Sequence, residues 1–457
     1  MADHAYSSDP AVQRQLDRLW ALSPGADILG LERITALLAR VGNPHEQLPP
    51  VLHVAGTNGK GSTCAFLRAA IEAAGYTTHV YSSPHLVRFN ERIRLAGILI
   101  EDAVLAPLLE EVLDAGGDIG ASFFEVTTAA AFLAFSRIPA DACILEVGLG
   151  GRLDATNVVA HPIVTGIAQL GIDHERFLGN TAEDIAAEKA GIAKPQVPLV
   201  TMRYAPSVEA RVMQAARTAG APVAPEGGHW FWSADDGHLT YRDAAGKVQT
   251  PLPRLAGPHQ PGNLALAIAM LHHQQVLTIP PEAFVAAAET ATWPARMQRL
   301  RDGPLTRLLP EGSEVWLDGG HNPAAGAAIA ASLTEISHPG EGRGPDTTQP
   351  ATGLRPSPGW NVVLGMLSNK DPRGLLEPMA PQISRLIAVP TPGHEHHAPD
   401  VLAAIARDLG IPATDTAPDV PAALASIAAS GRPRPVLILG SLYLAGEVLA
   451  ANGEPPA

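Results

Sequence analysis

A glycine-rich loop is the strongest chemical signal in the sequence. Residues 53–63 read HVAGTNGKGST, in which an apolar run leads into three glycines around Lys60, and two hydroxyl residues open an expected helix. Glycines let the backbone approach a phosphate, N–H groups at a helix N-terminus point at the anion, and a lysine adds a point charge. The spacing differs from the standard Walker pattern, because Val54 stands where the first glycine belongs and Gly61 follows the lysine. Strand, loop, lysine and helix together still favour nucleotide binding over an ordinary glycine-rich turn.

Side chains that follow other apolar runs could complete such a site. Glu146 closes the run ACILE, and a carboxylate at the carboxyl end of a buried parallel strand near a phosphate loop is suited to Mg²⁺. Asp173 and His174 follow a later strand and precede a helix that carries Lys189. Taken alone, such a histidine is more often a structural residue than a ligand. Only five of the 32 basic residues are lysines, and an ammonium is not interchangeable with a guanidinium, so each lysine is a candidate.

Residues 148–157, GLGGRLDATN, superficially resemble a dinucleotide-binding fingerprint. Leu153 takes the place of the final glycine, and no acidic residue closes a following strand at the right distance. We therefore interpret this segment as a rigid loop that presents Arg152 and Asp154.

A second series of elements carries a site-like loop of its own. The strand EVWLD ends at Asp318 and is followed by GGHNP with His321. A carboxylate and a histidine at the carboxyl end of a first strand are typical of a ligand crevice. The histidines of HEHH at 394–397 match no zinc spacing, so we interpret that segment as a loop.

Apolar runs that alternate with helical stretches predict an α/β fold with two sheets. The first series predicts a mostly parallel sheet, with strands at 51–56, 78–82, 141–147 and 163–168 and helices at 62–75, 103–115 and 126–136. A small antiparallel element is expected within 222–260, and a helix at 262–277. The second series predicts a smaller Rossmann-like α/β domain, with elements at 314–318, 324–336, 361–365, 384–389, 400–409 and 435–439. We expect domains at 1–296 and 297–457, with a flexible insertion at 338–359 that is rich in Gly, Pro, Ser and Thr.

Composition excludes several classes of protein. The 457 residues suffice for two or three domains, and 32 basic against 46 acidic residues give a net charge of −14. That charge argues against a partner such as nucleic acid or an anionic membrane, which need a basic surface, but not against an anionic substrate. Two cysteines suit a reducing compartment. The N-terminus lacks the pattern of a signal peptide, and no apolar run is long enough for a membrane helix. We expect a cytoplasmic protein.

The motifs occur in an order that resembles one family, the folylpolyglutamate synthases and bifunctional dihydrofolate synthase/folylpolyglutamate synthases of the Mur ligase superfamily. They extend from about residue 51 to 448 and read HVAGTNGKGST, YSSPHLVRFNERI, FFEVTTAAAF, LEVGLGGRLDATN, GIDHERFLG, AEKAGI, GPHQPGN, PARMQRL, LDGGHNP, GMLSNKD and VLILGSLYLAGEV. SSPHL and EVGLGGRLDATN are specific to the folate branch, whereas the cell-wall ligases share mainly the phosphate loop. The resemblance implies a first domain like the central domain of Mur ligases.

The resemblance also assigns site residues. It implies ATP binding by Gly56, Thr57, Asn58, Gly59, Lys60, Gly61, Ser62, Thr63, Asn263, Arg296, Asp318 and His321. It implies one or two Mg²⁺ ions held by Ser83, Glu146 and His174, and pterin binding by Phe124, Leu153, Asp154 and Ala155. The catalytic set would be Lys60, His174, Lys189 and Asp154, with Lys189 at the position that the family carbamylates.

By this resemblance the chain is an ATP-dependent amide ligase. The implied reaction activates the carboxylate of dihydropteroate or tetrahydrofolate as an acyl phosphate and joins it to L-glutamate. Two enzyme alternatives stay open: a monofunctional folylpolyglutamate synthase, and a Mur-type ligase that acts on another carboxylate. A nucleotide-binding regulator without catalysis is disfavoured, because Lys60, Glu146, His174 and Lys189 are all present. We expect a monomer whose partners are small-molecule substrates.

Overall fold

The protein is described by a computed structural model that covers residues 6–22, 29–337, 359–429 and 431–456. It forms two compact units: Leu255–His259 and Pro294–Pro456 make up the second, and the rest of the described chain up to Trp293 the first. The assignment of functional domains to 1–296 and 297–457 stays a prediction. The insertion expected at 338–359 lies outside the described residues except for Gly359.

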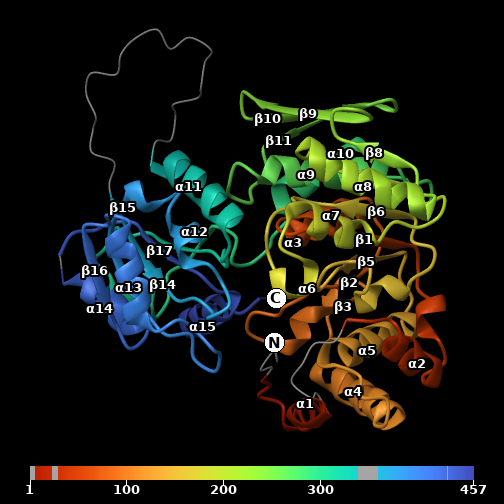
Figure 1. Cartoon of the computed structure of the whole chain (residues 1–457), viewed down its shortest axis with the longest axis horizontal. Helices are drawn as coiled ribbons and strands as arrows, with labels where there is room; N and C mark the ends of the chain where they lie inside the picture. The colour runs from red at the N-terminus through yellow and green to blue at the C-terminus, as the bar shows by residue number, and fades with distance from the viewer. Residues whose placement is uncertain (1–5, 23–28, 338–358, 430, 457) are drawn as a thin grey trace. The chain divides into compact units, whose positions relative to one another are not determined.

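The first unit is built on an eight-stranded sheet in the order β4-β3-β2-β5-β1-β6-β7-β8 (Figure 1). From β2 to β8 the neighbours pair in parallel, whereas β3 and β4 are antiparallel at one edge. This confirms the mostly parallel sheet. The strands are β1 Val51–Ala55, β2 Thr78–Tyr81, β3 Ile93–Leu95, β4 Ile98–Leu99, β5 Ala142–Glu146, β6 Val164–Ile167, β7 Leu199–Thr201 and β8 Val223–Pro225.

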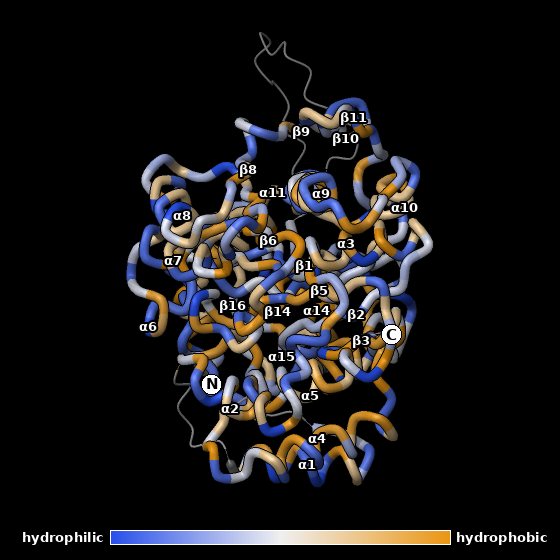
Figure 2. The backbone as a smooth tube through the Cα atoms, turned by 90° about the vertical axis from the view of Figure 1, so that its right-hand side faces the viewer, coloured by the Kyte–Doolittle hydropathy of each residue, from blue (hydrophilic) through white to orange (hydrophobic). Residues whose placement is uncertain are grey.

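Helices cover this sheet because its strands are apolar on both faces, as the hydrophobic colours of β1, β5 and β6 show in Figure 2. One buried cluster packs α1, α2, α4 and α5 against side chains of β1, β2 and β5, and another packs α7 and α8 against β6 and β7. The helices are α1 Pro10–Leu22, α2 Glu32–Arg40, α3 Lys60–Ala73, α4 Asp102–Gly116, α5 Phe123–Arg137, α6 Glu175–Leu178, α7 Ala182–Ala190, α8 Pro206–Ala219, α9 Gln260–His272 and α10 Pro281–Thr290. Short 3₁₀ helices are η1 Pro44–Glu46, η2 Phe89–Arg92 and η3 Ala155–Val158.

The expected antiparallel element is present as a three-stranded sheet in the order β11-β10-β9. Its strands are β9 Trp230–Asp235, β10 His238–Asp243 and β11 Gly246–Pro251.

The second unit has a six-stranded sheet in the order β12-β13-β17-β14-β15-β16, parallel except for β12. Its strands are β12 Gln298–Arg299, β13 Val315–Leu317, β14 Trp360–Leu364, β15 Ile383–Ala388, β16 Ala413–Thr416 and β17 Val436–Leu439. Its helices are α11 Pro323–Ser337, α12 Pro372–Leu376, α13 Pro399–Asp408, α14 Val420–Ala428 and α15 Leu442–Asn452, with η4 Thr306–Leu308 and η5 Ala380–Gln382. A smaller α/β domain was expected here, and the fold class is confirmed.

Several predicted helix boundaries were wrong by two to five residues, and two of them have a local cause. The helix expected at 62–75 begins at Lys60, because Gly59 caps it in a left-handed conformation (φ 82°) and its carbonyl accepts from Thr63. The helix expected to reach residue 277 ends at His272. The Gln274 side chain ends it locally, donating to Leu271 O and Leu277 O and accepting from the N–H groups of residues 276 and 277. No helix in the described ranges has both the length and the hydropathy needed to cross a bilayer.

Candidate active site

The glycine-rich loop joins β1 to α3, and its glycines are required by close neighbours. A Cβ on Gly59 would lie 2.5 Å from Oδ1 of Asn263, and one on Gly61 would lie 2.4 Å from the Trp293 ring. Neither position can accept a side chain unless these neighbours move. The predicted ATP residue Asn263, from α9, therefore lies directly against the loop, although about 200 residues separate it from Gly59 in the sequence.

Two lysines converge on one carbonyl oxygen of this loop. Nζ of Lys60 donates to Gly56 O at 3.1 Å and to Thr57 O at 3.3 Å, and Nζ of Lys189 donates to the same Gly56 O at 2.9 Å. Lys189 is 4% exposed. Burial, and then the nearby charge of Lys60, lower the pKa of Lys189 to about 7, although Asp173 acts in the opposite direction. Much of the Lys189 amine is therefore neutral, and thus nucleophilic, near neutral pH.

The predicted metal ligands follow the carboxyl ends of neighbouring parallel strands. Ser83 comes after β2, Glu146 ends β5, the glycine-rich loop follows β1 and His174 comes after β6, and these four strands are adjacent in the sheet. Glu146 is 5% exposed and pairs in register with Val54. Both Glu146 and Lys60 influence the pKa of the buried Cys64 thiol, which burial raises, so carboxylate and ammonium lie close to the same group.

These ligands fit a hard cation whose coordination is completed by substrate. A hydroxyl, a carboxylate and an imidazole are available at the sheet edge, and Mg²⁺ is usually held by one or two carboxylates with phosphates and water. Within the described ranges, no three His, Cys, Asp or Glu side chains gather closely enough to form a metal cage.

The loop at 148–157 is fixed to α7 by close backbone contact. A Cβ on Gly151 would lie 2.7 Å from Lys189 O, and one on Gly191 would lie 2.3 Å from Cβ of Arg152. Arg152 N donates to Glu188 O, and its guanidinium forms a 2.8 Å ion pair with the Glu188 carboxylate. The loop was expected to be rigid, and these contacts give the reason.

Asp154 is a buried residue of this loop whose carboxylate accepts several hydrogen bonds. It is 2% exposed and accepts from Leu149 N at 2.8 Å, Thr156 N at 3.0 Å and Thr156 Oγ1 at 2.5 Å. Burial raises its pKa, and these hydrogen bonds, together with one from the Gly148 N–H, act in the opposite direction. The Phe124 ring lies against Gly148, where an added Cβ would lie 2.4 Å from the ring. The centroids of the Phe124 and Tyr81 rings are 5.8 Å apart. The predicted pterin residues Phe124 and Asp154 thus both border the 148–157 loop; Leu153 is half-buried and Ala155 buried.

The predicted ATP residues of the second unit lie together at the end of β13. The Asp318 carboxylate accepts from Met297 N at 2.8 Å and from Gly320 N at 2.6 Å. A Cβ on Gly319 would lie 3.0 Å from Nη1 of Arg296, and Nδ1 of the predicted residue His321 lies 2.9 Å from Gly319 O. Asp318 and Arg296 also influence the pKa of His259, which burial lowers. Sequence reasoning quoted GPHQPGN but did not single out His259.

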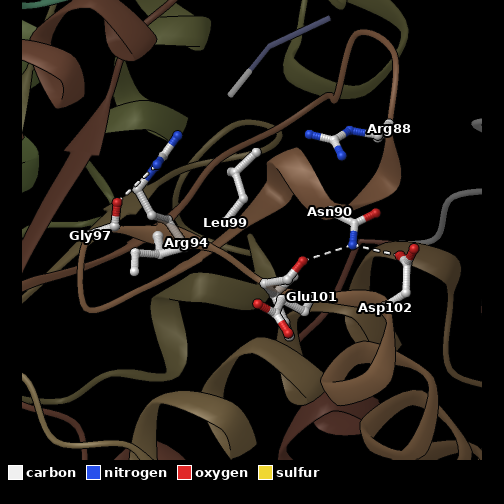
Figure 3. Close-up of a pocket in the computed structure, with 9 residues that line it drawn as sticks. Arg88, Asn90, Arg94, Gly97, Leu99, Glu101 and Asp102 are labelled. Carbon is white, nitrogen blue, oxygen red and sulfur yellow. Dashed lines mark hydrogen bonds between the residues drawn. The ribbon is translucent and has the colours of Figure 1, made fainter.

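An open pocket of about 500 Å³ lies elsewhere in the first unit, along the β3–β4 hairpin (Figure 3). Its lining includes Arg88 and Arg94, and Asn90 donates to Ile100 O and Asp102 Oδ1 at 2.8 Å each. None of the residues that the sequence predicted for the site lines this pocket.

Comparison with known proteins identifies the family. No family model matches the chain. It is 34% identical over 349 residues to the dihydrofolate synthase/folylpolyglutamate synthase of Escherichia coli, with 76% of this chain and 74% of the relative covered. The chain belongs to the dihydrofolate synthase/folylpolyglutamate synthase family. The resemblance that its motifs suggested is therefore confirmed. It is also 30% identical over 438 residues to the folylpolyglutamate synthase of Lacticaseibacillus casei, with 91% and 92% covered.

Solved structures of this family share the fold. Escherichia coli FolC in complex with DHPP and ADP superposes with a TM-score of 0.82 at 31% identity, covering 97% of each chain. Mycobacterium tuberculosis folylpolyglutamate synthase complexed with ADP and AMPPCP gives a TM-score of 0.84 at 29% identity, with 98% and 99% covered. A bifunctional member of the family was solved with Mn, AMPPNP and L-glutamate bound.

Sequence reasoning missed residues that act through long-range contacts. Trp293 lies against Gly61, and His53 lies 2.8 Å from Thr156 Oγ1 across 103 positions of sequence. His53 and Thr156 fall inside quoted motifs, but nothing in the local pattern pairs them. The signal that could have pointed to them is a polar residue inside a quoted motif to which no role had been assigned.

Proposed function

We propose that this chain catalyses both ATP-dependent addition of L-glutamate to dihydropteroate and addition of L-glutamate to tetrahydrofolate. As a member of its family, the chain is an ATP-dependent ligase that joins glutamate to folate-type carboxylates. One observation carries the proposal for these particular residues. The Lys189 side-chain nitrogen donates to Gly56 O of the glycine-rich loop, while its backbone carbonyl lies against Gly151 of the 148–157 loop. A single residue therefore joins the loop proposed to bind ATP to the loop proposed to bind the pterin substrate.

The chemistry requires charge neutralisation and positioning. An acceptor carboxylate oxygen forms a bond to the γ-phosphorus of ATP while the bond to ADP breaks, and this brings two anions together. The Lys60 ammonium and the N–H groups at the start of α3 supply positive charge at the phosphates. When bound by Ser83, Glu146 and His174, Mg²⁺ would supply further positive charge at the phosphates. The glutamate amine then attacks the acyl carbon, loses a proton, and inorganic phosphate leaves.

Carbamylation of Lys189 is part of the proposal. A neutral amine attacks the carbon of CO₂, forms an N–C bond and releases a proton, so a lysine with a pKa of about 7 is chemically suited to this modification. The carbamate would replace a cation beside Lys60 with an anion. Protein equilibrated with ¹³C-bicarbonate should show one carbamate carbon signal by NMR that is missing in Lys189→Met; a spectrum without that signal would contradict the modification.

The same proposal includes ATP binding by Arg296, Asp318 and His321, and pterin binding by Leu153 and Ala155. It also includes a monomeric state and a cytoplasmic location. Both cysteines are free and buried, which suits a reducing compartment.

The deciding experiment assays the two acceptors separately. Purified protein with ATP, Mg²⁺ and L-glutamate is supplied with dihydropteroate or with tetrahydrofolate, and both ADP and the glutamylated product are quantified by mass spectrometry. We expect glutamate-dependent product from each acceptor. Product from tetrahydrofolate alone would mean a monofunctional folylpolyglutamate synthase. In a parallel assay with a cell-wall precursor as acceptor, turnover with that precursor alone would overturn the assignment in favour of a Mur-type ligase.

A further inference from the structure

The segment between β2 and η2 carries Ser83, the one proposed metal ligand that has no charge and no ring nitrogen. Ser83 is half-buried and lies two residues after the end of β2. Mg²⁺ requires its ligands at about 2.0–2.1 Å in a nearly ideal octahedral arrangement. A hydroxyl on a loop meets that requirement only if the backbone that carries it is held in place. The contacts on both sides of Ser83 therefore bear on metal binding.

The Glu91 carboxylate holds the carboxyl-terminal side of this segment. It accepts three consecutive backbone N–H groups: that of Leu86 at 2.7 Å on Oε2, and those of Val87 at 3.0 Å and Arg88 at 2.7 Å on Oε1. Hydrogen bonds to an ionised acceptor are about twice as strong as those between neutral groups. One side chain therefore fixes three successive residues of the chain that follows Ser83.

The amino-terminal side of the segment is held by the main chain of the same short helix. Ser82 N donates to Arg92 O at 3.0 Å, and Ser82 Oγ donates to Glu91 O at 3.4 Å. Ser82 is 7% exposed, so these bonds are largely shielded from water. β2 and β3 pair directly beside these contacts. The residues before and after Ser83 are thus both fastened at the end of η2.

Glu91 is itself placed by η2 and the strand that follows it. Glu91 N donates to Arg88 O at 3.0 Å, while the Glu91 carboxylate accepts from Arg88 N, so the residue closes a capping box on the first turn. η2 leads directly into β3, where Ile93 pairs in register with Tyr81 of β2. A carboxylate fixed by a capped turn and a paired strand is suited to orienting a ligand on the neighbouring loop.

The neighbouring residue of η2 makes comparable bonds to a different part of the fold. Asn90 is 6% exposed and donates to Ile100 O and to Asp102 Oδ1 at 2.8 Å each (Figure 3). These bonds tie η2 to the start of α4. The short helix therefore uses one side chain for the hairpin and helix beside it, and another, that of Glu91, for the segment that carries Ser83.

We propose that Glu91 is a positioning residue that holds the backbone of residues 82–88, so that the Ser83 hydroxyl reaches the divalent cation bound with ATP. This inference rests on the proposed function, because it takes Ser83 as a metal ligand. Glu91 contacts neither the metal nor a substrate in this scheme. Residues that orient a metal ligand typically contribute tenfold to a hundredfold, on the order of magnitude, to metal affinity.

The test measures nucleotide binding and needs no turnover. The affinity for AMPPNP is determined by calorimetry with and without Mn²⁺, and the ratio of the two affinities gives the contribution of the metal. Glu91→Ala removes all three acceptors, whereas Glu91→Gln keeps one side-chain oxygen. Ser83→Ala removes the proposed ligand, and the double variant shows whether the two residues act together. The matched control is Asn90→Ala, which removes two hydrogen bonds from the same short helix without touching residues 82–88.

We expect Glu91→Ala to lower the affinity ratio about tenfold to a hundredfold, while the affinity for metal-free AMPPNP stays within about twofold. Glu91→Gln should lower it less, by about threefold to tenfold, because one oxygen can still accept. In the double variant the ratio should match that of Ser83→Ala within about twofold, since a residue that acts through Ser83 has no effect without it. Asn90→Ala should lower Tm and leave the ratio unchanged.

Hydrogen exchange of the metal-free protein gives a second measurement. The amides of residues 86–88 should exchange faster in Glu91→Ala than in wild type, because their common acceptor is gone. In Asn90→Ala they should exchange at the wild-type rate. Unchanged exchange in Glu91→Ala would show that the carboxylate does not hold this segment.

Two further results would overturn the inference while leaving the proposed metal site intact. One is an unchanged affinity ratio in folded Glu91→Ala when Ser83→Ala lowers it, and the other is a double variant in which the two losses add in full. If Glu91→Ala does not fold, Glu91→Gln with and without Ser83→Ala decides by the same criteria. An unchanged ratio in Ser83→Ala would instead remove Ser83 from the proposed metal ligands, and the inference would fail with it. Turnover of the two acceptors is assayed separately and does not depend on this outcome.

Discussion

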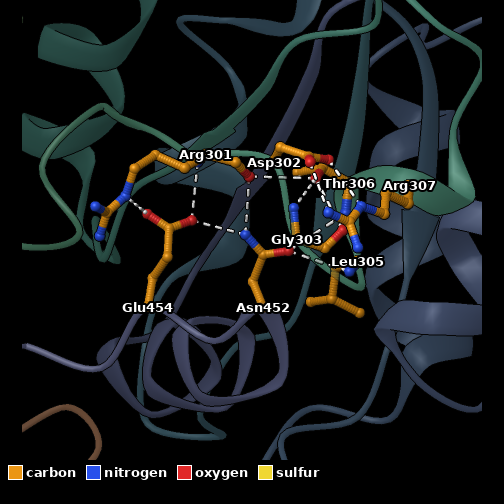
Figure 4. Close-up of polar contacts among 8 residues, drawn as sticks. All are labelled: Arg301, Asp302, Gly303, Leu305, Thr306, Arg307, Asn452 and Glu454. Atoms are coloured by element: carbon orange, nitrogen blue, oxygen red, sulfur yellow. Dashed lines mark hydrogen bonds and ion pairs between the residues drawn. The ribbon is translucent and has the colours of Figure 1, made fainter.

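Two polar clusters of this protein are each built around a buried carboxylate but lie in different parts of the chain. In the first unit, His53, Thr156 and Asp154 form a chain that ends on a carboxylate, which also accepts from Leu149 N. In the second unit, Arg301, Asn452 and Glu454 form a closed network (Figure 4). All of these side chains are buried except that of Arg301, which is 81% exposed. Only the first cluster contains a residue, Asp154, that the family motifs assign to the site.

The closed network uses every side-chain polar atom of its central residue. Asn452 Nδ2 donates to Arg301 O at 3.1 Å and to Glu454 Oε1 at 2.7 Å, and its Oδ1 accepts from Leu305 N at 3.1 Å. Glu454 accepts from Arg301 N at 2.8 Å and from Arg301 Nε at 3.0 Å. The network ties the end of α15 to the segment after β12. A fully satisfied polar network makes the structure around it rigid.

The largest expected effect falls on the site and should spare stability. Lys60→Ala removes the cation at the proposed phosphate position, so we expect kcat to fall about 10²-fold to 10³-fold, as for loss of one transition-state donor. Lys60 is half-buried, and its side-chain bonds to the described residues are those to Gly56 O and Thr57 O, so Tm should change little. Steady-state kinetics and thermal unfolding check this, with the exposed Lys247→Ala as control. Full activity of Lys60→Ala would reject its role.

Asn452→Ala should show the opposite pattern. It leaves the buried Leu305 N without its partner and removes one of the two side-chain donors to Arg301 O, so we expect the free energy of unfolding to fall by about 2–3 kcal/mol. At a temperature where the variant is folded, KM for both substrates should match wild type. Urea unfolding and kinetics on the same preparation test this contrast, and a change in KM without loss of stability would invert it.

Lys189 belongs to the proposed site and also affects stability, and its lowered pKa predicts that the free energy of unfolding depends on pH. Its folded pKa of about 7 lies below the ordinary lysine value, so above pH 7 the unfolded chain holds a proton that the folded chain lacks. Stability contributed by this group should therefore rise with pH from about 7 toward the unfolded pKa, by at most about 1.4 kcal/mol per pH unit. The measurement is urea unfolding between pH 6.5 and 9 in CO₂-free buffer. Lys189→Met should lose that increment, and equal slopes in both proteins would contradict the lowered pKa.

The smallest effect is expected at the exposed rim of the closed network. The Arg301 side chain is 81% exposed in its ion pair with Glu454, and its backbone N–H remains after substitution. Arg301→Ala should therefore cost less than about 1 kcal/mol, as solvent-exposed ion pairs do. A loss as large as that of Asn452→Ala would show that the side chain, and not the main-chain bonds, holds the network.

The parts of the fold and site that sequence predicts are those written in consecutive residues. The mostly parallel sheet, the antiparallel element and the second α/β series follow from local apolar patterns, and the structure contains them. The glycine-rich loop was recognisable because its glycines, its lysine and the start of the following helix all lie within residues 53–63. Boundaries failed at Gly59 and Gln274, where one residue's backbone or side chain overrides the helical pattern.

Sequence by itself determined which residue types are present and which family they match, because motifs survive as short contiguous strings. Tertiary structure alone decided that Asn263 and Trp293 lie behind two loop glycines, that Lys60 and Lys189 share one carbonyl, and that His53 reaches Asp154 through Thr156. These contacts join residues far apart along the chain, so no local periodicity records them. Burial then gives Lys189 its lowered pKa, since the cost of a charge depends on surroundings that only the folded chain supplies.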